Sequence, residues 1–171
     1  MRKVAFGCAL LSGMVLIAPG AFAQRPVRFP KDYKTWTHVT TTVVNDKKHP
    51  AYGVRHIYVN AKGKKAALSR AKTFPDGTEV VLVFFNVVDL KIPNPRAKGT
   101  KSQKVMTGKR FKLDHMVKDS VRYAKTGGWN YSRFLLPSKK YLGKVPYVKA
   151  CFGCHNKRAK KLDFVFTRAP R

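Results

Sequence analysis

The chain has 171 residues and a formal net charge of +28, because 36 lysines and arginines outnumber eight aspartates and glutamates. Its apolar content of 44% is ordinary and sufficient to bury a core. The sequence contains no internal repeat and no low-complexity tract, which excludes a repeat array.

The N-terminal residues 1–23 have the pattern of a secretory signal peptide. A short positive start precedes a largely apolar stretch over residues 4–17, and Ala21-Phe22-Ala23 is a typical cleavage site. The stretch is too short and wrongly flanked for a stable membrane anchor. We therefore predict an exported, periplasmic protein without a membrane span, whose residues 24–171 form a single domain.

The remaining sequence is dominated by expected β-strands. Alternating or β-branched stretches, separated by turn residues, predict strands at 36–44, 54–59, 80–88, 105–117, 129–136 and 162–168. Two short helices are expected, one capped by Asn60 and reaching 68–71, the other from 119 or 120 to 123. We expect an extended lead-in at 25–32, a loop at 91–104 and a connection at 142–150. The predicted fold class is α+β, a mainly antiparallel β-sheet with a few short helices.

The motif Cys151-Phe152-Gly153-Cys154-His155 near the C-terminus is the attachment signal for c-type haem. The two thiols add to the porphyrin vinyl groups, and the adjacent histidine becomes the proximal iron ligand. A redox Cys-x-x-Cys pair would favour a βαβ setting, and a zinc site would need two further ligands nearby. Signal cleavage removes Cys8, so both remaining cysteines belong to the motif. We therefore expect one covalent haem c, held by Cys151, Cys154 and His155.

The charge of the exported chain, about +26 after loss of the signal peptide, admits two interpretations. Lysine pairs are scattered along the sequence, which favours a generally basic surface. The alternative is a docking face for an acidic redox partner or an anionic membrane, since such a field accelerates encounter with acidic partners. Nucleic acid is not an expected partner, because exported haem proteins seldom meet it.

Several further segments, in this order and spacing, resemble the cytochrome P-460 and cytochrome c′-beta superfamily. They are Tyr33-Lys34-Thr35-Trp36, Arg55-His56-Ile57-Tyr58-Val59-Asn60, Phe74-Pro75-Asp76-Gly77-Thr78, the run from Met116 to Ala124, Thr126-Gly127-Gly128-Trp129, Ala150 to His155, and Asp163 to Arg168. The resemblance implies a mainly antiparallel β domain, usually a homodimer, with a five-coordinate haem c that is open on its distal side.

The two branches of that superfamily differ at a position that corresponds to Leu82 here. The cytochrome P-460 branch resembles a hydroxylamine oxidase, whose haem is cross-linked to a lysine in the strand after the Asp-Gly-Thr turn. The cytochrome c′-beta branch lacks the cross-link and binds nitric oxide. This chain has no lysine between Glu79 and Leu90, which argues against a cross-link.

The resemblance also suggests which residues line the distal side. Arg55 aligns with a distal arginine and Asp114 with a distal carboxylate. The alternative is that the two residues form a structural ion pair or lie on the surface. An arginine can donate to a bound ligand and a carboxylate can accept its protons. Candidate pocket walls are Tyr52, Phe84 and Phe85. Alternative sixth iron ligands are Met106, Met116, His38, His49, His56 and His115.

Three functions follow from these alternatives. The leading hypothesis is binding of a small nitrogen ligand, chiefly nitric oxide. The second is an oxidoreductase acting on hydroxylamine, with Arg55 and Asp114 as catalytic helpers. The third is an electron carrier, which would require a methionine or a second histidine on the iron.

Overall fold

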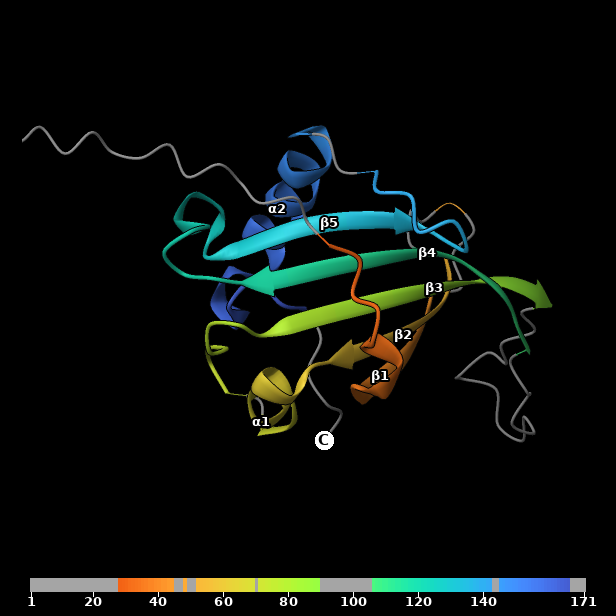
Figure 1. Cartoon of the computed structure of the whole chain (residues 1–171), viewed down its shortest axis with the longest axis horizontal. Coiled ribbons are helices and arrows are strands. Elements are labelled where there is room, and N and C mark those ends of the chain that lie inside the picture. The colour runs from red at the N-terminus through yellow and green to blue at the C-terminus, as the bar shows by residue number, and fades with distance from the viewer. Residues whose placement is uncertain are drawn as a thin grey trace, which may run out of the picture.

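In a computed structural model, residues 28–44, 48, 52–69, 71–89, 106–142 and 145–166 are described. Five strands form one antiparallel sheet in the order of the sequence (Figure 1). The strands are β1 (Thr37–Val44), β2 (Gly53–Val59), β3 (Glu79–Asp89), β4 (Met106–Lys118) and β5 (Trp129–Leu135). The helices are α1 (Ala61–Ser69) and α2 (Val145–Ala159), with 3-10 turns η1 (Tyr33–Thr35), η2 (Ala124–Thr126) and η3 (Lys160–Leu162). The α+β prediction is confirmed.

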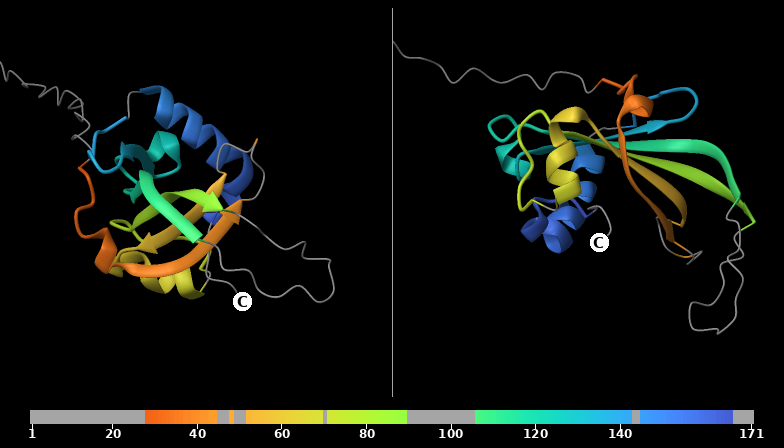
Figure 2. Two further views of the ribbon diagram at one scale, coloured as in Figure 1. Left: turned by 90° about the vertical axis from the view of Figure 1, so that its right-hand side faces the viewer. Right: turned by 90° about the horizontal axis from the view of Figure 1, so that it is seen from below.

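The sheet has two differently covered faces. Both helices lie on one side of it, whereas the N-terminal segment with η1 lies on the other (Figure 2). The first side, which we call the helix face, buries Ile57, Val80, Met116 and Tyr131 against the helices and the C-terminal segment. The second side, the outer face, buries the cluster of Tyr33, Val81, Val83, Leu113 and Phe134. Strand β3 contributes to both clusters, which explains its apolar run on both faces.

Helix α1 begins where the sequence predicts it. The side-chain oxygen of Asn60 accepts a hydrogen bond from the backbone N–H of Gly63 at 3.1 Å, and the side-chain amide donates to the carbonyl of Gly77. The N-cap therefore also ties the helix to the turn before β3. A Cβ on Gly63 would lie 2.4 Å from Thr78 and 2.5 Å from Val59, so the glycine permits the helix to approach the sheet closely.

Three predictions of local structure are wrong. The segment at 142–150, expected to be a connection, is helical from Val145, because α2 begins before the motif. The expected helix at 119–123 is a single turn, in which Asp119 caps the N–H of Arg122, followed by η2 and by Gly127 in the left-handed region. The expected closing strand at 162–168 is absent from its described part, residues 162–166. Asp163 and Phe164 have φ values of 50° and 60°, which are incompatible with an extended strand.

Several sequence predictions concern regions outside the described residues. These are the signal peptide at 1–23, the first three residues (25–27) of the lead-in at 25–32, and the loop at 91–104. Over the described ranges, no helix has the length and apolar character needed to cross a bilayer.

Candidate functional site

The Cys-x-x-Cys-His motif lies in helix α2, which packs along β5 on the helix face. Cys151, Cys154 and His155 are three and four residues apart, so they occupy one side of the helix. Cys151 is half-buried against the core and Cys154 is exposed, and both thiols are free. No group of three His, Cys, Asp or Glu side chains positioned for a metal ion is found in the described part of the chain. The zinc interpretation therefore finds no further ligands there.

The imidazole of His155 is held in a defined orientation. Its Nδ1 lies 2.6 Å from the carbonyl oxygen of Phe164, and since a carbonyl only accepts, Nδ1 carries the proton. Burial lowers the pKa of His155, although the bond to Phe164 and the charge of Asp114 oppose this effect. The ring is therefore neutral near pH 7, with Nε2 as the lone-pair donor. A metal-ligating histidine needs this arrangement.

Aromatic rings surround the imidazole on the strand side. The ring of Tyr131 lies 5.0 Å from that of His155 and the ring of Phe166 lies 4.7 Å away. The hydroxyl of Tyr131 is buried without a hydrogen-bond partner among the described residues, and burial raises its pKa. Because Tyr131 is in β5, it fixes the position of His155 relative to the sheet.

The side chains of the helix face are ordered in rows that cross the strands. The first row is Val59, Val80, Met116 and Tyr131; the second is Ile57, Leu82, Asp114 and Arg133; the third is Arg55, Phe84, Lys112 and Leu135. Rows on one face are two residues apart, so successive rows are separated by about 7 Å. His155 contacts the first row through Tyr131. The predicted residues Leu82, Asp114 and Arg55 therefore lie on the same face as the motif.

The carboxylate of Asp114 is paired with Arg133. Nε and one terminal nitrogen of Arg133 donate to the two oxygens of Asp114 at 2.5 and 2.6 Å, a bidentate ion pair. Asp114 also acts electrostatically on His155 and on Cys151. The sequence suggested Arg55 as the partner of Asp114, whereas the structure pairs Asp114 with Arg133. Arg133 is two residues from Tyr131 in the same strand, so strand alternation predicts that both side chains lie on one face.

Arg55 remains without a carboxylate partner among the described residues. Its Nε is buried and makes no hydrogen bond to them. Burial lowers the pKa of Arg55, and the nearby charge of Asp114 opposes this effect. The guanidinium thus has an unused donor on the helix face.

Lys112 is a second cation in the third row, and it was not among the residues predicted from the sequence. Its Nζ lies 4.1 Å from the centre of the Phe84 ring and 5.4 Å from that of Phe111. Burial lowers the pKa of Lys112, and the charges of Arg133 and Arg55 lower it further. Lys112 precedes Asp114 by two residues in β4, so strand alternation predicts that both share a face.

The described alternative iron ligands are divided between the two faces of the sheet. Met116 is buried in the first row, on the side of His155. The side chains of His38, His56 and His115 belong to the outer face, where His115 bonds Glu79 at 2.8 Å and the rings of His38 and His56 are 5.5 Å apart. His49 and the side chain of Met106 lie outside the described residues.

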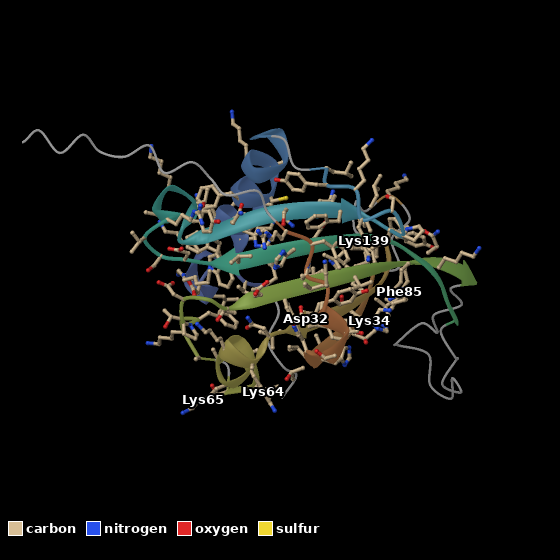
Figure 3. The ribbon with its side chains drawn as sticks, in the orientation of Figure 1. Asp32, Lys34, Lys64, Lys65, Phe85 and Lys139 are labelled. Atoms are coloured by element: carbon tan, nitrogen blue, oxygen red, sulfur yellow. The ribbon has the colours of Figure 1, made fainter. Side chains whose placement is uncertain are left out.

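The candidate pocket walls are divided between the two faces. Phe84 is on the helix face, whereas Phe85 lines a cavity of about 530 Å³ on the outer face, together with Tyr33 and Arg110. Lys34 and Lys139 lie beside Phe85 at this cavity (Figure 3). Tyr52, which precedes β2, is half-buried.

Comparison with known proteins identifies the family of the chain. The profile of the family described as Cytochrome P460 matches residues 30–167, which include all three rows and the motif. No curated protein matches the chain.

Proposed function

Because this chain belongs to the cytochrome P460 family, and is thus a haem-binding cytochrome, we propose that it is an exported protein with one covalent haem c. We further propose that its haem keeps an open distal position, which binds small nitrogen ligands such as nitric oxide. A haem with this coordination supplies an iron centre that takes up a diatomic ligand without a competing side chain.

The donor atoms of α2 support covalent haem attachment. Two free thiols three residues apart and a neutral imidazole next to the second thiol are on one side of one helix. The imidazole is already oriented by the carbonyl of Phe164.

The observation that carries the proposed open position is the placement of the alternative ligands. His38, His56 and His115 point away from the motif, on the far side of the sheet. Met116 is enclosed in the core, in the first row next to Tyr131. The sheet separates these three histidines from the motif, which argues against any of them as a second protein ligand of the iron.

Hydroxylamine oxidation is less well supported. Leu82 occupies the second row, where the oxidase branch has its cross-linking lysine, and both oxygens of Asp114 are engaged by Arg133. A carboxylate in a bidentate ion pair is a poor proton acceptor. These contacts favour ligand binding over a reaction that releases protons.

The test is intact-mass and spectroscopic analysis of the holoprotein, expressed in a host that matures c-type haem. We expect the mass of the chain 24–171 plus one haem, no lysine adduct, a high-spin ferric spectrum, and binding of nitric oxide without turnover of hydroxylamine. The Cys151→Ala variant should impair attachment. A lysine–porphyrin adduct together with hydroxylamine turnover would reverse the order of the two functions, and a chain that folds stably with zinc would exclude both.

A further inference from the structure

The second and third rows of the helix face carry an excess of positive charge. Three cations, Arg55, Lys112 and Arg133, surround one carboxylate, that of Asp114. Arg133 and Asp114 neutralise one another in their bidentate pair. Arg55 and Lys112 therefore contribute two charges that no described carboxylate balances.

Both uncompensated cations are partly removed from water. Arg55 and Lys112 are half-buried, and burial is the largest cause of the lowered pKa of each. Lys112 has the rings of Phe84 and Phe111 as partners, and these rings do not neutralise its charge. The buried Nε of Arg55 has no acceptor among the described residues, and a polar group in such a position loses hydration without compensation. An anion within reach of both side chains, which flank Phe84 in the third row, would supply an acceptor and a counter-charge.

The two cations are also on the expected ligand side of the site. The His155 ring packs on Tyr131 in the first row, whereas Arg55 and Lys112 are in the third row. Two row spacings separate them along the strands, about 14 Å. Leu82 and Asp114, in the second row, lie between the proximal histidine and the cation pair.

We infer that Arg55 and Lys112 form an anion-binding recess, which makes the site selective for small anionic nitrogen ligands, of which nitrite is the example. This inference rests on the proposed open haem and names its ligand class. Nitric oxide is neutral, so the pair of cations adds little to its binding. Hydroxylamine is neutral or cationic, so the recess does not favour it. An anion gains charge-assisted hydrogen bonds from both side chains.

The same cations have a competing partner in the haem itself, since its propionates are anions too. The experiment must therefore separate binding of an external anion from retention of haem. Ferric holoprotein is titrated with nitrite, azide and the neutral ligand imidazole, with wild type compared with Lys112→Met, Lys112→Arg and Arg55→Gln. Lys109→Met is the matched control, because Lys109 is an exposed lysine of the same strand that lines the outer-face cavity.

We expect Lys112→Met and Arg55→Gln each to weaken nitrite and azide binding by about tenfold or more, as for loss of one charge-assisted hydrogen bond. Imidazole binding should change less than about twofold, Lys112→Arg should retain most of the anion affinity, and Lys109→Met should resemble wild type. If Lys112→Met yields no folded holoprotein, Arg55→Gln and the pH profile of the wild type carry the same test.

Other results would overturn the inference. Equal losses for anions and imidazole would indicate a general distortion of the site. Unchanged anion affinity with weaker haem retention would assign the recess to the propionates. A low-spin wild-type spectrum that becomes high-spin in Lys112→Met would identify Lys112 as an iron ligand. If the wild type binds none of the three ligands or nitric oxide, the proposed open haem itself is wrong.

Discussion

Nζ of Lys118 lies 2.7 Å from Oδ1 of Asp163, and the two side chains are only 10% and 8% exposed. The other oxygen of Asp163 accepts the backbone N–H of Phe74 at 2.8 Å. Asp163 directly precedes Phe164, whose carbonyl orients His155. This nearly buried ion pair therefore fastens the segment after α2 to the end of β4 and indirectly positions the proximal histidine.

Replacement of Asp163 should destabilise the protein and loosen His155. Asp163→Ala leaves the Lys118 ammonium nearly buried without its partner, which typically costs about 3–5 kcal/mol. Denaturant unfolding of the holoprotein measures the loss, and the Soret and resonance Raman spectra report the altered proximal bond. Asp76→Ala is the control, because Asp76 is exposed and bonds Ser120 at the surface. Equal losses in both variants would contradict the assigned role.

Gly127→Ala should be destabilising for two independent reasons. Gly127 has a φ of 69°, and a Cβ there would lie 2.3 Å from the ring of Phe164. The left-handed backbone alone costs a non-glycine residue about 1–2 kcal/mol, and displacement of Phe164 adds to this. Thermal unfolding of the holoprotein should show a lower midpoint than for Lys125→Ala, a change in the same turn. An unchanged midpoint in Gly127→Ala would contradict both reasons, whereas a loss limited to about 1–2 kcal/mol would show that the Phe164 ring moves aside.

The sheet was predictable because its signals are local. Apolar residues alternate along β2 and β4, and β3 is apolar on both faces. Each of these patterns is visible within a single strand and predicts that strand without knowledge of its neighbours. The family resemblance implied that Arg55 and Asp114 share one side of the site, and the strand register places both on the helix face. The partnership of Asp114 with Arg133 was not predictable in this way, because cross-strand register depends on how the strands pair across the whole sheet.

The C-terminal region was harder to predict, because long-range contacts determine it. Helix α2 has Val145, Pro146 and Gly153, which are weak helix formers, although a proline in the first turn is a helix-start signal. The alternation at Leu162, Phe164 and Phe166 suggested a strand, but Val165 is the buried residue. Asp163 and Phe164 both have left-handed backbone conformations. The carboxylate of Asp163 bonds Lys118 and the carbonyl of Phe164 bonds His155, and no local sequence pattern reveals these contacts.

Changes at the alternative iron ligands should leave the haem spectrum unaltered. His115→Gln retains a donor toward Glu79 on the outer face, and Met116→Leu conserves core volume at a cost below about 1.5 kcal/mol. Optical and electron paramagnetic resonance spectra of the ferric holoproteins should match those of the wild type. A shift from low to high spin in either variant would identify that residue as a sixth ligand and favour an electron carrier.

Anion binding to the holoprotein should weaken as the pH rises. The ammonium form of Lys112 attracts the anion, and its pKa is lowered first by burial, then by Arg133 and Arg55, against the opposing charge of Asp114. The ammonium is therefore fully present at low pH and is lost as the pH rises through this lowered pKa. Nitrite affinity should fall over that alkaline window, by up to about tenfold per pH unit for one linked proton.

Competition by hydroxide for the iron also weakens anion binding at high pH, so the wild type alone does not isolate the contribution of Lys112. In Lys112→Met the linked proton is absent, whereas hydroxide competition remains. The ratio of wild-type to variant affinity should therefore be largest at neutral pH and approach one above the lowered pKa of Lys112. Lys109→Met should track the wild type throughout. A ratio that does not change with pH would show that the charge of Lys112 does not act on the bound anion, and the cationic recess would then reduce to Arg55.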